Sequence, residues 1–243
     1  MSSVVISLVG TFPGIQVPTV MTSGPFNVND IELIYVHDPM CSWCWAFRSR
    51  FQELQEHLPG GIKVTRLLGG LAPDSDRPMP YPLQRGLQGT WRRIEQSVAG
   101  TRFNHDFWTR CQPRRSTWPA CRAVIAAREL DPELEPTMIE AIQRAYYLEA
   151  RNPSDADTLI SLAQTLGLDG RQFGALLNAP ETHAVLGEEI ARARSIGADR
   201  FPSLRLQIAR SSWPIPVDYG ERRSMLDAIR QLIDQNSADH AGR

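Results

Sequence analysis

The fold of this chain is decided by residues 31–44, which read IELIYVHDPMCSWC. The first six residues are mostly apolar or β-branched, which is the composition of a buried strand, and HDPM then interrupts the run. From Cys44 to His57 the apolar residues recur at helical spacing. The stretch therefore predicts a strand that leads directly into a helix, with both cysteines of a C-x-x-C motif at the junction.

The two cysteines are expected to have different roles. Only a thiolate attacks a disulfide, and the unpaired N–H groups and positive dipole end at a helix start stabilise negative charge. Because Cys41 leads the helix, we expect it to be exposed and to attack, while Cys44, one turn further on, resolves the mixed disulfide. The alternatives are half of a zinc site or inert core cysteines, and no second pair of cysteines at metal spacing is present.

A resemblance to a known family supports this interpretation. Residues 38–47, DPMCSWCWAF, resemble the active-site segment of the DsbA-like branch of the thioredoxin superfamily, and most of all a bacterial group described as disulfide isomerases. The resemblance implies an α/β, thioredoxin-like fold with a helical insertion. It also implies that Pro202, in Phe201-Pro202-Ser203, is a cis-proline that faces the C-x-x-C. Phe201 and Pro202 would then line the substrate site, with an exposed Trp43 as an apolar ledge.

One position departs from the pattern of the family. Many members carry a buried carboxylate six residues before the first cysteine, where it assists proton transfer to the second, and this chain has Tyr35 there. A tyrosine, with a pKa near ~10, is a poor base at neutral pH. We expect His37, Asp38 or water to act as the proton shuttle instead.

The rest of the chain predicts one domain with a long insertion. Residues 1–30 are expected to be a loose extension, 31–72 and 199–235 the two parts of the thioredoxin-like domain, 73–198 the helical insertion, and 236–243 a polar tail. Expected strands are 31–36, 62–68, 203–209 and 213–217, the last at a sheet edge because it contains two prolines. Expected helices are 44–57, 83–98, 119–130, 132–149, 154–166, a short one after Asp169, 181–196 and 221–233.

Composition limits the partners. The 243 residues carry a formal net charge of −1, which gives no electrostatic reason to expect nucleic acid or an acidic membrane. No Lys or Arg precedes Arg48, and the apolar start of the chain contains two prolines, so we expect no secretory signal. No apolar segment is long enough to span a membrane. The expected location is therefore the cytoplasm, where the C-x-x-C would be mostly reduced.

Other chemically active residues have plainer explanations. We expect Cys111 and Cys121 to be small buried side chains rather than a second redox pair or metal ligands. We expect these aromatics to belong to the core of the helical part: Trp91, Phe103, Phe107, Trp108 and Trp118. The pairs 92–93 and 114–115 are arginines that either face solvent or bind a glutathione carboxylate.

Three functions of different classes remain. The leading one is a protein-disulfide oxidoreductase or isomerase that acts on protein or low-molecular-weight thiols, with no metal and no cofactor other than glutathione as a co-substrate. A glutathione-dependent transferase or isomerase of the kappa type has a similar layout, but such enzymes typically carry a serine where Cys41 stands. A non-enzymatic adaptor protein of the DsbA-like fold would need no reactive thiol, so a Cys41→Ser variant separates it from the enzymes.

Overall fold

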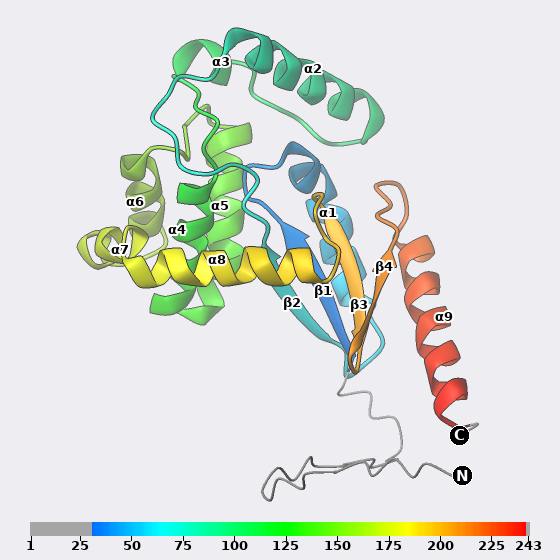
Figure 1. Ribbon diagram of the computed structural model, residues 1–243. Helices are drawn as coiled ribbons and strands as arrows, with labels where there is room; N and C mark the ends of the chain where they lie inside the picture. The colour runs from blue at the N-terminus through cyan, green and yellow to red at the C-terminus, as the bar shows by residue number, and fades with distance from the viewer. Residues whose placement is uncertain (1–30, 242–243) are drawn as a thin grey trace, which may run out of the picture.

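The computed structural model describes residues 31–241, so the expected N-terminal extension lies outside the described residues. Its centre is a four-stranded sheet in the order β2-β1-β3-β4 (Figure 1). The strands are β1 (Ile31–His37), β2 (Lys63–Leu68), β3 (Ser203–Ile208) and β4 (Ser211–Ile215). β1 runs parallel to β2 and antiparallel to β3, and β4 forms the edge next to β3, as its Pro214 predicts.

The strand register brings the two sequence landmarks together. β1 is buried along nearly its whole length, as expected for the near-continuous apolar run of a central strand. Because Val36 pairs with Ser203, the end of β1 lies beside the start of β3. The helix α1 (Ser42–Glu56) begins directly after β1, so residues 160 positions apart in the chain meet at this end of the sheet.

The two faces of the sheet are covered by different helices. Alternate β1 side chains such as Leu33 and Tyr35 share one core with α1 and with α9 (Arg222–Ala241). Ile34 and Val36 point to the other face, where α8 (Pro180–Ser195) packs. This alternation follows from the two-residue period of a strand.

The helices between β2 and β3 form a second, larger core beside the sheet (Figure 1). They are α2 (Tyr81–Ser97), α3 (Phe107–Arg110), α4 (Trp118–Leu130), the 3₁₀ turn η2 (Pro132–Leu134), α5 (Glu135–Tyr147), α6 (Ala156–Thr165), α7 (Gly170–Leu177) and α8. The expected α/β fold with a helical insertion is confirmed. Trp91, Phe103 and Phe107 are buried in this core, and Trp108 and Trp118 pack against it half-buried, also as predicted.

Three details of the helix prediction are wrong. The segment 132–149 is not one helix, because a single 3₁₀ turn precedes α5. Pro136 lies in the first turn of α5, where a missing N–H costs no hydrogen bond, and this marks the true start of that helix. The short helix α3 was not predicted. The final helix was expected to end at residue 233, but α9 continues to Ala241 and includes most of the expected polar tail at 236–243. None of the helices within residues 31–241 is long and apolar enough to cross a membrane.

Candidate active site

Cys41 occupies the N-cap position of α1. Its φ of −83° and ψ of 115° are those of extended backbone, while its carbonyl accepts the first helical hydrogen bond from Trp45 N at 3.0 Å. The Cys41 N–H donates to Asp38 O at 3.0 Å, which closes the turn between strand and helix. Cys41 therefore lies at the end of α1 where the first-turn N–H groups have no partner within the helix.

The other side of the Cys41 sulfur faces the start of β3. The thiol donates to Phe201 O at 3.6 Å, and the Phe201–Pro202 peptide bond is cis, as the resemblance implied. Gly69, just after β2, makes room for the Phe201 ring, because a Cβ on Gly69 would lie 2.1 Å from two ring carbons. Sequence patterns alone gave no signal for this contact.

Gly69→Ala is expected to destabilise the protein by about 1–3 kcal/mol, because Phe201 must move to make room for the added Cβ. Urea unfolding measures this change in the free energy of unfolding. Gly89→Ala is the matched control, since a Cβ there meets nothing within 4 Å. Equal stability of the two variants would contradict the expectation.

The expected exposure of Cys41 and Trp43 is wrong. Cys41 is 7% exposed and Cys44 is fully buried, and both thiols are free. Trp43 is half-buried, with its ring 5.2 Å from that of Tyr219. Ser42, between the cysteines, accepts a hydrogen bond from Trp91 Nε1 at 2.9 Å, so α2 also contacts the motif.

Cys41 reaches the surface through a groove of about 200 Å³. We call this space the groove; it is lined by Met40, Cys41, Ser42, Trp43, Leu71, Met79, Leu87, Thr90, Arg114, Arg115, Thr117, Tyr146 and Phe201. Of the three residues expected to contact substrate, Trp43 and Phe201 are part of this lining and Pro202 is not. The groove is therefore built mostly by the helical insertion and the loop that leads into it.

Asp38 holds the turn before Cys41 in place. Its Oδ1 accepts from Met40 N at 2.8 Å, and its Oδ2 accepts from Leu71 N at 2.7 Å, Thr117 Oγ1 at 2.6 Å and Cys121 Sγ at 3.5 Å. Burial raises the pKa of the carboxyl, while these donors act in the opposite direction. The role of Cys121 is thus explained: it is a buried donor to Asp38.

The remaining cysteine, Cys111, lies outside the C-x-x-C motif. Cys111 is half-buried rather than buried, and its thiol donates to Ala150 O at 3.0 Å. Within residues 31–241, no group of three or more His, Cys, Asp or Glu side chains is arranged to hold a metal ion.

His37 is buried and electrically neutral. Its ring stacks on that of Tyr35 at 4.9 Å, and desolvation, reinforced by Arg66, lowers the pKa of His37 to about 3. An imidazole with that pKa accepts a proton poorly at neutral pH. The Asp38 carboxylate already accepts four hydrogen bonds. The assignment of the proton shuttle to His37 or to Asp38 therefore stays a prediction.

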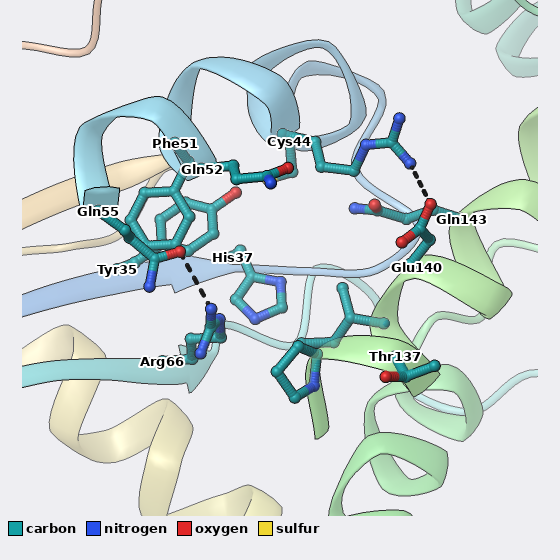
Figure 2. Close-up of a pocket in the computed structure, with 13 residues that line it drawn as sticks. Tyr35, His37, Cys44, Phe51, Gln52, Gln55, Arg66, Thr137, Glu140 and Gln143 are labelled. Atoms are coloured by element: carbon teal, nitrogen blue, oxygen red, sulfur yellow. Dashed lines mark hydrogen bonds and ion pairs between the residues drawn. The ribbon is translucent and has the colours of Figure 1, made fainter. Parts of the chain in front are cut away.

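A second hollow of about 350 Å³ lies behind Cys44, between α1, β1, β2 and α5 (Figure 2). We call it the chamber; it is lined by Tyr35, His37, Cys44, Arg48, Phe51, Gln52, Gln55, Arg66, Pro136, Thr137, Ile139, Glu140 and Gln143. Each cysteine of the pair therefore has a space of its own: the groove for Cys41 and the chamber for Cys44.

A C-x-x-C at the start of a helix, opposite a cis-proline and beside a helical insertion, is the arrangement of a DsbA-like thioredoxin-fold protein. Residues 32–204 match the DSBA-like thioredoxin domain, and the chain belongs to that family.

Several solved structures are similar to this chain. A disulfide isomerase candidate from Nitrosomonas europaea shares the fold with a TM-score of 0.73 and 23% identity, over 84% of this chain and 98% of that one. The cytosolic disulfide reductase DsbM from Pseudomonas aeruginosa is 25% identical over the same shares, with a TM-score of 0.63. A further structure of DsbM, with GSH, has a TM-score of 0.62.

A curated relative carries a different description. The ClpXP adapter protein SpxH from Halalkalibacterium halodurans is 24% identical in an alignment of 183 residues that covers 71% of this chain and 57% of that protein. The chain thus spans little more than half the length of this relative.

Proposed function

We propose that the chain catalyses thiol–disulfide exchange through Cys41 and Cys44. The observation that carries the proposal is the position of Cys41 at the N-terminus of α1, in the lining of the groove, with its sulfur 3.6 Å from Phe201 O. Membership of a family with disulfide reductases among its relatives supports it.

The chemistry runs in two steps. The Cys41 thiolate attacks one sulfur of a substrate disulfide, so that the substrate S–S bond breaks, the first thiolate leaves, and a mixed disulfide forms. Cys44 then attacks the Cys41 sulfur, the second substrate thiolate leaves, and the enzyme holds a Cys41–Cys44 disulfide. Two electrons pass from the enzyme dithiol to the substrate, and the reverse sequence oxidises a substrate dithiol.

We infer that the substrate is a small disulfide that carries a carboxylate, such as oxidised glutathione. The groove combines apolar side chains with two guanidinium groups, and at about 200 Å³ it admits one arm of such a molecule. Arg114 is already held by Asp155 Oδ1 at 2.5 Å and Ser154 O at 2.6 Å, so Arg115 is the better partner for the substrate carboxylate. The DsbM structure with GSH supports this substrate class.

Arg115→Met is expected to raise KM for oxidised glutathione roughly five- to tenfold, the effect of one half-exposed charged hydrogen bond, with little change in kcat. KM for the uncharged hydroxyethyl disulfide should not change. Arg93→Met, on the exposed face of α2, is the matched control. A similar KM change for both disulfides would contradict a carboxylate contact.

We propose the cytosol as the place of action, because the relative DsbM is described as cytosolic and a reducing compartment supplies the thiol form of the pair. Alkylation of the thiols in intact cells before lysis tests this, and the expected result is a pair that is mostly reduced.

An adaptor without enzymatic activity is the second candidate, and the likeness to SpxH favours it. An adaptor presents a surface to its partners, so the reactivity of Cys41 would be dispensable. The variants described in the Discussion separate the two.

A further inference from the structure

The walls of the chamber contain buried polar atoms that protein groups leave unsatisfied. Both ring nitrogens of His37 and the Oε1 of Gln143 have no hydrogen-bond partner among the described residues, and these side chains are only 1% and 2% exposed. An unsatisfied buried polar atom costs about 1–3 kcal/mol, and a polar cavity large enough for water normally contains it. With a volume of about 350 Å³, the chamber is large enough.

The chamber connects Cys44 to solvent. Cys44 is fully buried, yet it lines the chamber together with the exposed side chains of Gln52, Thr137 and Glu140. Arg48 Nη1 of α1 also bonds to Glu140 Oε1 of α5 at 3.0 Å in the chamber lining, and Figure 2 draws this contact as the dashed line at Glu140. A proton released at Cys44 therefore has a polar route outward that does not cross the groove.

Tyr35 stands at the inner end of this route. Tyr35 lines the chamber together with Cys44 and interacts electrostatically with its thiol. Its ring is fixed between those of His37 and Phe51, with ring centroids 4.9 Å and 4.1 Å away. Burial raises the pKa of Tyr35 well above its usual value, so it does not act as a base. A hydroxyl nevertheless accepts one proton while it donates another, which is what a relay requires.

The resolving step needs such a relay. Burial raises the pKa of the Cys44 thiol, so its proton must leave as the sulfur attacks. The carboxylate of Asp38 already accepts hydrogen bonds from the turn, from the loop after β2 and from the start of α4, so it is not the group to which we assign this proton.

We propose that Tyr35 and the water of the chamber form the proton path of Cys44, in place of the carboxylate that many relatives carry at this position; the proposal rests on the function proposed above. As the Cys44–Cys41 bond forms and the bond from Cys41 to the substrate sulfur breaks, the Cys44 proton passes to the Tyr35 oxygen. The Tyr35 hydroxyl proton passes to chamber water and leaves past Glu140. The departing thiolate takes a proton from solvent, so the step is balanced, and His37 holds the water as a neutral hydrogen-bonding group.

The charged and titratable groups around this path come from every element packed against it. They are Tyr35 and His37 of β1, Arg66 of β2, Arg48 of α1, Glu140 of α5, Asp38 of the turn and Tyr219 of the loop after β4. Arg48 is hydrogen-bonded to Glu140, and Arg66 is hydrogen-bonded to Gln55. These two arginines therefore form part of the chamber wall and do not accept the proton.

The test is a rapid-quench experiment with reduced protein and oxidised glutathione, in which mass spectrometry counts protein that carries one glutathione. In Tyr35→Phe the mixed disulfide should form at the wild-type rate and decay about tenfold more slowly. This expected decrease in rate is smaller than the factor of ~10²–10⁴ that a positioned general acid or base contributes, because water partly replaces the missing hydroxyl. The solvent deuterium effect on the decay should rise, which a purely structural defect would not produce.

Two further variants complete the test. Gln143→Leu removes a polar side chain from the chamber wall, away from the groove, and should slow the decay of the mixed disulfide to a smaller extent. Tyr81→Phe, at an exposed tyrosine, is the matched control and should change neither the formation nor the decay of the mixed disulfide. Normal turnover with an unchanged decay rate and isotope effect in Tyr35→Phe and Gln143→Leu overturns the path alone. A wild-type protein that forms no mixed disulfide and no Cys41–Cys44 disulfide overturns the proposed function and the path together.

Discussion

Cys41→Ser is expected to lower turnover of oxidised glutathione by a factor of about 10³ or more, the scale on which enzymes lose activity without their nucleophile. The serine hydroxyl can still donate to Phe201 O, so the turn and α1 should keep their structure. The loss would then belong to the sulfur alone, because an alcohol at this position neither ionises at neutral pH nor attacks a disulfide.

Two other cysteine variants make this result interpretable. Cys44→Ser retains the attacking thiol, so it should accumulate one glutathione per chain and stop there. Cys111→Ser alters a half-buried thiol outside the groove and should leave turnover unchanged. Substantial turnover by Cys41→Ser would contradict the assignment of the nucleophile, whereas a wild-type protein without any turnover would favour the adaptor.

The stability of the protein is expected to fall steeply with acid because of His37. The unfolded chain protonates this histidine near pH ~6.5, but the folded protein does so only at about pH 3. Between these values the unfolded state binds a proton that the folded state does not, so the stabilisation is complete above the unfolded pKa and is lost as the pH falls. The free energy of unfolding should decrease by about 3 kcal/mol between pH ~6.5 and ~4 from this residue alone.

Urea unfolding over this pH range checks the expectation with His37→Phe, which retains an aromatic ring against Tyr35 but does not titrate. The variant should show a flatter pH dependence than the wild type. Burial raises the pKa of Asp38, so its contribution to the free energy of unfolding has the opposite sign and favours the folded state as the pH falls. Asp38 is present in both proteins, so the difference between their pH dependences isolates the contribution of His37. His183→Gln, on the exposed face of α8, is the control, and parallel curves for wild type and His37→Phe would refute the role of His37.

The parts of the site that could be predicted are those that local sequence determines. The change from strand to helical periodicity placed both cysteines at the start of α1, and the resemblance identified Pro202 as cis. Tyr35 showed that the usual carboxylate was missing. These features depend on a few neighbouring residues or on one family motif, so no knowledge of the tertiary packing was needed.

The rest depends on segments that are distant in the chain. Cys41 is covered because the groove is built by Leu71, Met79 and Arg115, and no periodicity indicates that they meet. The hydrogen bond from Trp91 to Ser42 has the same origin. The chamber exists because α5 packs near α1, and that distance is set by the whole insertion rather than by any motif.

The four donors of Asp38 limit how far this protein could be shortened. Met40 belongs to the same turn, but Leu71 leads into the insertion, and Thr117 and Cys121 belong to the start of α4. A shortened protein that kept only the sheet, α1 and α9 would expose this carboxylate to solvent and release the turn that presents the attacking sulfur. A shortened protein that is meant to retain the proposed thiol–disulfide exchange must therefore keep the helical insertion, because the loop after β2 and the start of α4 hold the turn in place.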